Sequence, residues 1–510
     1  MAELPIAEIV SQVRTGIRSA RSFTEAALER MAAQSNYRAF VHTSRDVALG
    51  QADAIDARRA RGETLGLLAG VPIGIKDVIC TVDFPTTCGS RILTKTEKGK
   101  PDPETGWRSP FDATVILRLR AADAVIVGKT NMDEFAMGSS NESSAYGPAL
   151  NPWDPARISA GSSGGSAVAV AAAMTPVSLG SDTGGSIRQP AGLCGVVGLK
   201  PSYGRVSRYG LVAYASSLDQ IGPFSRDVAS AARILSVIAG ADPRDSTCST
   251  VPVADYEQAC QRDVRGLRLG VPAEYFAEGL DPDIRASIEH VLHHYRNAGC
   301  EIVPVSLPHT RYGIATYYIL ATAEASANLA RFDGVRFGLR VEPPRSDLGT
   351  LYGATRDTGF GKEVKRRILL GTYVLSAGYY DAYYRKAQQA RTLIVRDFQH
   401  AFTQVDAIVT PTSPTPAFPL GAKTDDPLAM YLEDIYTLPC NLAGLCAISL
   451  PAPMTKATTD RPALPVGLQL LAPPFREETL FALGADWERS SGGFCHPAHA
   501  AAPNSPQGTV

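Results

Sequence analysis

The chain lacks the features that mark several common protein classes. Its 510 residues hold 50 Lys and Arg against 51 Asp and Glu, a net charge of −1, so no overall positive field favours nucleic acid or an anionic membrane. No apolar run reaches the roughly 18 uncharged residues that span a bilayer. Charged residues interrupt the first twenty positions, unlike a signal peptide. We expect a cytoplasmic protein.

Metal, disulfide and phosphate-loop signals are also missing. Nine cysteines are scattered along the chain, and no two have C-x-x-C spacing, which argues against a zinc site and a disulfide framework. A phosphate-binding loop ending in the GKT of 128–130 would need glycine five residues before Gly128, where Asp123 stands. We therefore expect no metal and no cofactor in this chain.

The two ends of the chain are expected to differ from its centre. Residues 1–65 are predicted to be a helical scaffold packed on the core: Ser22 and Glu25 form a capping-box pattern, and Ser44 is placed to cap a second helix that ends at Gly62. Residues 490–510 are small, polar and proline-rich, so we expect a disordered tail.

Residues 66–489 are expected to form the α/β core, in a single domain with residues 1–65. Short apolar runs alternate with helical stretches, which predicts a sheet covered by helices on both faces. The runs lie at 67–79, 124–128, 175–180, 267–272, 300–307 and 406–411, and a helix is expected over 281–297. Residues 94–110 are polar and rich in Pro, Gly and Lys, so we expect an exposed loop insertion.

Serine and glycine are concentrated between residues 159 and 186, which hold seven serines and six glycines. Two apolar stretches inside this segment, 167–174 and 175–179, exclude a flexible linker because they would be stable only inside a core. We therefore expect two tight turns, at 161–166 and 180–186, joined by a buried helix and strand. Backbone N–H groups with so little side-chain cover suit an oxyanion site.

One interpretation of these turns is a nucleophile elbow. Ser163 lies between glycines in the pattern G-x-S-x-G, but the preceding segment 151–160 is not strand-like. No histidine occurs between residues 43 and 289, so a Ser-His-Asp hydrolase would have to use His309 or His400. This hypothesis stays open on the residues alone.

The other interpretation is a serine nucleophile activated by lysine. Lys76 follows a strand-like run in apolar surroundings. To act as a base near neutral pH, its pKa must fall from ~10.4 by about three units, a cost of about 4 kcal/mol that burial can supply. The alternative for Lys76 is a structural salt bridge with Asp77 or another acid.

Lys76, the GSSGG turn (161–165) and the segment GSDTGGSIRQP (180–190) together resemble the amidase signature family. Longer motifs are similar to the glutamine-hydrolysing subunits of tRNA-dependent amidotransferases within that family. They lie at 129–140, 198–223, 324–338, 359–384 and 425–444, and the similarity runs from about residue 5 to 490. The departures are the insertion at 94–110 and Ala160, where the family usually has glycine.

The resemblance implies a mixed α/β fold and a Ser-cisSer-Lys triad. Ser186 would be the nucleophile, Ser162 the serine of the cis peptide, and Lys76 the base. The backbone N–H groups expected to form the oxyanion hole are those of Thr183, Gly184, Gly185 and Ser186.

For binding of free glutamine, the resemblance places Arg367 on the α-carboxylate and Asp434 on the α-ammonium, with Tyr317 beside them. A cation and an acid are what a zwitterion requires. Arg366 is adjacent to Arg367, and the sequence alone does not decide between the two.

The implied function is hydrolysis of glutamine through a γ-glutamyl ester on Ser186. The ammonia would serve the ATP-dependent conversion of Glu-tRNA(Gln) to Gln-tRNA(Gln), and in some organisms of Asp-tRNA(Asn). ATP and Mg²⁺ would be used by a partner, the GatB subunit, which also holds the tRNA, and a small GatC subunit would complete a heterotrimer. The alternatives are a stand-alone amidase of small amides and a non-enzymatic scaffold.

Overall fold

The centre of the protein is one eleven-stranded sheet in a computed structural model that describes residues 4–459 and 461–497. The strand order is β1-β3-β2-β4-β6-β5-β10-β11-β9-β7-β8. Four strand pairs are parallel and six are antiparallel, so the sheet is mixed. The strands are β1 (Phe40–Thr43), β2 (Pro72–Lys76), β3 (Val125–Thr130), β4 (Val177–Asp182), β5 (Val197–Lys200), β6 (Gln220–Ser225), β7 (Arg268–Pro272), β8 (Glu301–Val305), β9 (Ala407–Pro411), β10 (Cys446–Ala452) and β11 (Val466–Ala472).

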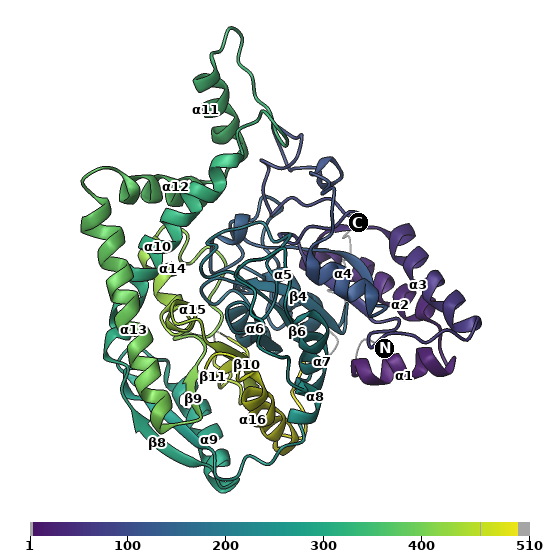
Figure 1. Ribbon diagram of the computed structural model, residues 1–510, viewed down its shortest axis with the longest axis vertical. Helices are drawn as coiled ribbons and strands as arrows, with labels where there is room; N and C mark the ends of the chain where they lie inside the picture. Colours follow the sequence, from purple (N-terminus) through teal and green to yellow (C-terminus); the bar gives the residue numbers. More distant parts are fainter. Residues whose placement is uncertain (1–3, 460, 498–510) are drawn as a thin grey trace.

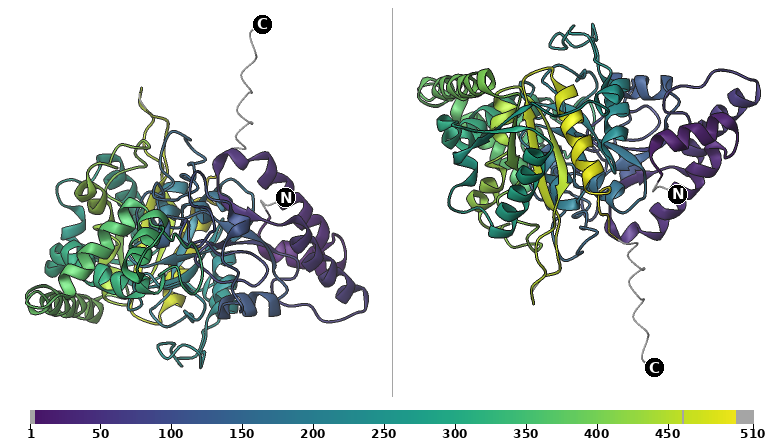
Figure 2. Two further views of the ribbon diagram at one scale, coloured as in Figure 1. Left: turned by 90° about the horizontal axis from the view of Figure 1, so that it is seen from above. Right: turned by 90° about the horizontal axis from the view of Figure 1, so that it is seen from below.

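Helices cover both faces of this sheet, as the sequence predicts (Figures 1 and 2). Helices α5 and α6 pack on the central strands. Helix α7 packs on β5 and β6 and α16 on β10 and β11, while α8 packs on α7 and α16. Helices α12 and α13 both pack on α10. The helices are α1 (Ile6–Thr15), α2 (Ala20–Ala33), α3 (Arg45–Ala60), α4 (Thr114–Ala121), α5 (Gly164–Ala171), α6 (Arg188–Cys194), α7 (Val228–Ile238), α8 (Tyr256–Ala259), α9 (Pro282–Asn297), α10 (Gly313–Asn328), α11 (Leu348–Gly359), α12 (Lys362–Leu375), α13 (Arg385–Gln404), α14 (Pro427–Tyr431), α15 (Leu438–Leu442) and α16 (Glu477–Ser490).

Each of the six predicted apolar runs overlaps a strand, in order β2, β3, β4, β7, β8 and β9, although β3 and β4 extend two residues beyond their runs. The helix expected over 281–297 is α9. Residues 1–65 are not purely helical, because β1 lies in this segment and pairs with β3 at the edge of the sheet. The capping box was also misplaced: Ser19, not Ser22, accepts the N-cap hydrogen bond of α2. Ser44 caps α3 as expected.

The loop at 94–110 is tied to its surroundings. The Thr86 N–H donates to the Trp107 carbonyl at 2.8 Å, and His42 Nε2 lies 2.8 Å from a Glu104 carboxylate oxygen. At the other end of the chain, Phe494 packs against the main core, whereas residues 498–510 of the expected tail lie outside the described residues. Within the described ranges, no helix has the length and apolar character needed to cross a membrane.

The close packing of α12 on α10 yields a stability prediction. A Cβ at Gly371 of α12 would lie 1.9 Å from the Thr322 carbonyl oxygen of α10. Gly371→Ala should therefore push the helices apart and cost about 1–3 kcal/mol, seen as a lower midpoint in thermal unfolding. The control Gly353→Ala lies in α11 with nothing within 4 Å and should stabilise by about 0.5–1 kcal/mol. Equal shifts for the two variants would contradict the packing argument.

Candidate active site

Lys76 ends β2 and is fully buried. Its Nζ donates to Ser162 Oγ at 2.7 Å, to Ser181 Oγ at 2.9 Å and to the Ser181 carbonyl at 3.3 Å. Burial lowers the pKa of Lys76 to about 7, although nearby carboxylates, among them Asp133 and Asp182, favour the charged form. A substantial fraction of this amine is therefore neutral near pH 7.

Asp77 does not pair with Lys76. Its carboxylate accepts the backbone N–H groups of Thr87, at 3.1 Å, and Gly89, at 3.2 Å, and it lies 3.8 Å from Lys129 Nζ. The salt-bridge alternative with Asp77 is therefore not found, and Lys76 instead contacts the hydroxyl-rich turns.

The first Gly/Ser turn presents Ser162 to this lysine. The peptide between Gly161 and Ser162 is cis, and the Ser162 carbonyl accepts the Asp133 N–H at 3.1 Å. A Cβ at position 161 would lie 1.9 Å from Asp133 Oδ2, so only glycine fits there. The neighbouring Ser163 N–H donates to the Ser186 carbonyl at 3.2 Å, which joins the two turns directly.

The second turn runs from the end of β4 at Asp182 to the start of α6 at Arg188, with Ser186 within it. The two Asp182 oxygens accept the N–H groups of Gly185, at 2.8 Å, and Ile187, at 3.1 Å, and one lies 3.0 Å from Arg188 Nε. Although burial opposes it, the Arg188 guanidinium holds the pKa of Asp182 below its usual range.

This arrangement changes the set of expected oxyanion donors. The Gly185 N–H is committed to Asp182, so it is not available to an oxyanion. In the described part of the chain, the N–H groups of Thr183, Gly184 and Ser186 donate to no protein acceptor. Three of the four expected donors therefore remain free.

Asp434 and Tyr317 lie close to the second turn. A Cβ at Gly184 would be 2.7 Å from the Tyr317 ring, so the tyrosine packs directly against the turn. Asp434 is buried, and burial raises its pKa to about 6. Its carboxylate accepts three hydrogen bonds at 2.9 Å, from Gln189 Nε2, Ser139 Oγ and the Tyr318 hydroxyl.

Arg367 and Arg366 occupy different surroundings on α12. Arg367 is 3% exposed, and it donates to the Tyr214 hydroxyl and to Glu363 at 2.8 Å each. Arg366 forms an ion pair with the other Glu363 oxygen and is about one-third exposed. Only the Arg367 guanidinium lies over three tyrosine rings, those of Tyr214, Tyr318 and Tyr431, 5.2–5.7 Å from their centroids.

Sequence reasoning missed several side chains that complete this arrangement. Tyr318 both donates to Asp434 and packs under Arg367, and Gln189 joins the nucleophile turn to Asp434. The available signals were the adjacent tyrosines in ATYY and the position of Gln189 three residues after Ser186. Nothing in the sequence beyond the local serine content indicated that Ser181 would contact Lys76 or that Ser139 would contact Asp434.

The nucleophile-elbow hypothesis finds no support in the contacts. Ser163 Oγ is buried and donates to the Ser181 carbonyl at 3.1 Å. His309 pairs with Asp397 at 2.8 Å, and His400 contacts Gln404 on the exposed face of α13. Among the described histidines, none hydrogen bonds to Ser163.

One cavity borders part of the predicted glutamine site. It has a volume of about 380 Å³ and is lined by Ser139, Glu363, Arg366, Arg367 and Tyr431, among others. Of the three residues predicted to bind glutamine, Arg367 lines this cavity, whereas Tyr317 and Asp434 do not.

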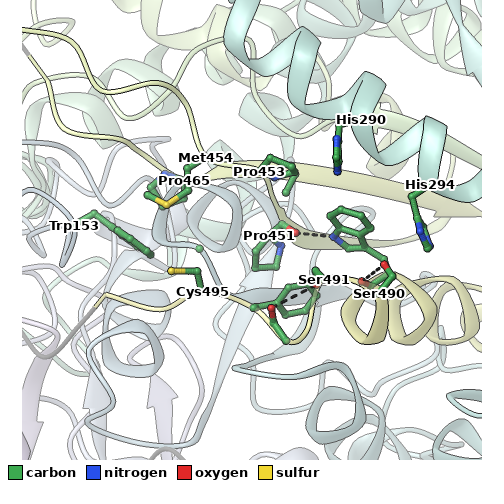
Figure 3. Close-up of a pocket in the computed structure, with 15 residues that line it drawn as sticks. Trp153, His290, His294, Pro451, Pro453, Met454, Pro465, Ser490, Ser491 and Cys495 are labelled. Atoms are coloured by element: carbon green, nitrogen blue, oxygen red, sulfur yellow. Dashed lines mark hydrogen bonds between the residues drawn. The ribbon is translucent and has the colours of Figure 1, made fainter.

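A second cavity, of about 350 Å³, lies near the end of α16 and is lined by none of the predicted site residues (Figure 3). The indole N–H of Trp487, which lies beside His290 and His294, is already donated to the Pro451 carbonyl at 2.9 Å. We assign this cavity no chemistry. Over residues 4–459 and 461–497, no cluster of three or more His, Cys, Asp or Glu could hold a metal ion.

Comparison with known proteins identifies relatives over almost the whole chain. A family model described as Amidase matches residues 22–481. The A-subunit of glutamyl-tRNA(Gln) amidotransferase from Chloroflexus aurantiacus is 57% identical over 472 residues, which are 92% of this chain and 93% of that protein. The protein of the same name from Myxococcus xanthus is 54% identical over 490 residues, 96% of this chain and 97% of that protein.

Solved structures agree with this relationship. The crystal structure of the glutamyl-tRNA(Gln) amidotransferase A-subunit from Thermotoga maritima has a TM-score of 0.79 and 38% identity, covering 98% of each chain. The native peptide amidase from Stenotrophomonas maltophilia also has a TM-score of 0.79, with 31% identity over 98% of this chain and 99% of that one.

The buried Asp182–Arg188 pair gives a prediction about the site. Asp182→Asn leaves the fully buried Arg188 without its carboxylate, so we expect a loss of about 3 kcal/mol in unfolding free energy. The control Asp53→Asn removes the partner of Arg21 in an exposed ion pair and should cost less than about 1 kcal/mol. Chemical denaturation of both variants measures the difference, and a similar small loss for both would refute the role assigned to the buried pair.

Proposed function

The chain belongs to the amidase family, and we propose that it is the glutamine-hydrolysing subunit of an amidotransferase that converts Glu-tRNA(Gln) to Gln-tRNA(Gln). The observation that carries the chemistry is the buried Lys76 amine, 2.7 Å from Ser162 Oγ, beside the turn that holds Ser186. The names of relatives that are 54–57% identical support the assignment to this particular enzyme.

The proposed reaction begins with neutral Lys76. The amine accepts the Ser162 proton, Ser162 accepts the Ser186 proton, and Ser186 Oγ attacks the γ-carboxamide carbon of glutamine. The free N–H groups of Thr183, Gly184 and Ser186 would stabilise the oxyanion, typically by about 3 kcal/mol per donor. The same chain of groups returns a proton to the leaving ammonia, and water then hydrolyses the γ-glutamyl ester.

Glutamine would lie between this turn and α12. Arg367 is a buried cation suited to the α-carboxylate, and Asp434 is an acid suited to the α-ammonium. The hydroxyls of Ser139 and Tyr318 now donate to Asp434. Because a hydroxyl can rotate, these two groups can give way to an incoming ammonium. Tyr317 would cover the substrate beside Gly184.

Other chains would supply what this one lacks. This chain has a net charge of −1, and its sequence does not match the phosphate-binding loop pattern. Both facts support a division of labour in which GatB binds tRNA, ATP and Mg²⁺ and GatC completes a cytoplasmic heterotrimer. A concentration of large apolar side chains on the surface also fits a member of an assembly. Those most exposed on α12 and the segment after it are Leu369, Leu370, Tyr373, Tyr379, Tyr380 and Tyr383. Whether Asp-tRNA(Asn) is also served would be decided on the partner chain.

The base can be tested through its pKa. Since only neutral Lys76 accepts a proton, kcat/KM for glutamine should rise with pH and reach half its maximum near pH 7. Lys76→Ala and Lys76→Arg should each lower kcat by about 100-fold or more, because a guanidinium does not deprotonate near neutrality. An active Lys76→Arg enzyme would show that the lysine acts only by its charge.

The reaction and the partners require a direct experiment. The chain, purified alone and co-expressed with the neighbouring subunits, is given glutamine, ATP and Glu-tRNA(Gln). We expect a glutamine-like electrophile to label Ser186 in peptide mapping, and Gln-tRNA(Gln) to form only in the complex.

Three results would contradict the proposal. Labelling of Ser163 would indicate an elbow-type hydrolase. Faster hydrolysis of aliphatic amides than of glutamine, with no effect of Asp434→Ala, would indicate a stand-alone amidase. Amidation of the tRNA by the isolated chain would refute the division of labour.

A further inference from the structure

We infer that Asp219 is a positioning residue, whose buried carboxylate holds the oxyanion turn and the substrate-binding arginine in one fixed relation. The inference rests on the proposed function, because it concerns the geometry of glutamine hydrolysis. Asp219 lies just before β6 and is 2% exposed.

Asp219 makes two sets of contacts, which we call its two arms. The first arm, the contact with Thr183 of the turn, follows from the strand register. β4 and β6 are antiparallel, and Asp182 faces Gln220. The next pair beyond the ladder is therefore Thr183 and Asp219. The Thr183 hydroxyl donates to Asp219 Oδ1 at 2.6 Å, so the carboxylate fixes the residue whose N–H begins the proposed oxyanion hole.

The second arm joins Asp219 to Tyr214 and, through Tyr214, to Arg367. Asp219 Oδ2 accepts the Tyr214 N–H at 3.0 Å, and both oxygens accept the Ala215 N–H, at 3.2 and 3.1 Å. The buried Tyr214 in turn accepts a hydrogen bond from Arg367 at its hydroxyl, at 2.8 Å. The Asp219 carboxylate thus binds both the turn, through Thr183, and the backbone of Tyr214. Among the described residues, Tyr214 carries the only tyrosine hydroxyl to which Arg367 donates.

The Asp219 side chain must supply oxygen acceptors for these contacts. It accepts hydrogen bonds from one hydroxyl and from two backbone N–H groups. The N–H groups can only donate, whereas the Thr183 hydroxyl can donate or accept. An asparagine can therefore turn its NH₂ group toward Thr183 and keep both arms, whereas Asp219→Ala removes all of these contacts and loses both.

The test compares Asp219→Ala, which removes both arms, with variants that remove one arm each. Thr183→Val removes the hydroxyl donor and should lower kcat about 10-fold with KM for glutamine little changed. Tyr214→Phe removes the acceptor for Arg367 and should raise KM about 10-fold with kcat little changed. Asp219→Ala should do both, because Asp219 belongs to both arms.

A matched control separates positioning from general stability. Asp242 is also a buried carboxylate, and it bonds to Thr114, Ser207 and Arg244. Asp242→Ala should leave kcat and KM per active site unchanged even if its melting temperature falls, with active sites counted by labelling of Ser186.

Several outcomes would overturn the inference. An Asp219→Ala enzyme with normal KM per labelled site would do so, as would a Thr183→Val enzyme with normal kcat. If Asp219→Ala does not fold, the two single-arm variants still decide the matter. Hydrolysis of a simple aliphatic amide, which lacks the α-groups, should respond to Thr183→Val but not to Tyr214→Phe. Should the wild type turn over that amide but not glutamine, the proposed function fails while the oxyanion arm remains testable.

Discussion

The ion pair between Asp182 and Arg188 is the interaction on which the geometry of the site depends. Its carboxylate lies between the end of β4 and the start of α6, and it binds the N–H groups on either side of Ser186. A fully buried side chain, paired with a fully buried guanidinium, thereby sets the path of the turn. Among the described residues, the N–H groups of Thr183, Gly184 and Ser186 have no protein acceptor.

The same guanidinium also joins distant parts of the fold. Arg188 donates to Gln469 of β11 at 2.6 Å, and to Asn441 and the Thr437 carbonyl around α15 at 2.5 and 3.1 Å. The turn that holds Ser186 is therefore bonded to the far half of the sheet. The residues proposed to bind glutamine come from α10, α12 and the segment before α15, outside this turn, so they can differ among amidases that share the fold. The shared fold of a peptide amidase, 31% identical, fits this separation.

The elements that could be predicted are those with local signals. Strands such as β3 and β9 begin with an apolar run, whereas β6 contains Gly222 and Pro223 and β1 has only four residues, so neither has a clear strand pattern. The triad was predicted from short motifs that resemble those of a known family. The contacts of Tyr318 and Gln189 with Asp434 join residues more than one hundred positions apart, and no sequence periodicity encodes such pairs. The hydrogen bond from the Gly185 N–H to Asp182 likewise depends on the orientation of the Asp182 side chain, which the sequence does not encode.

Two buried lysines on adjacent strands show what distinguishes a base from a structural cation. Lys76 of β2 faces Thr130 of β3 in the register, one position from Lys129. Burial lowers the pKa of both amines. Lys129 donates to the Ile79 carbonyl at 2.6 Å and to Thr86 Oγ1 at 2.8 Å, with the buried Asp77 at 3.8 Å.

Loss of the Lys129 proton would leave the Asp77 carboxylate buried without a countercharge, which strongly opposes deprotonation. The hydrogen-bond partners of Lys76 are neutral hydroxyls and a carbonyl. A hydroxyl can reverse its role and donate to a neutral amine, so the contact with Ser162 survives removal of the proton. Of these two lysines, only Lys76 forms no ion pair among the described residues. The buried carboxylates of Asp133 and Asp182 favour its charged form from a greater distance, but burial outweighs them. Lys76 is therefore the better suited of the two to give up and regain a proton, as a relay through Ser162 to Ser186 requires.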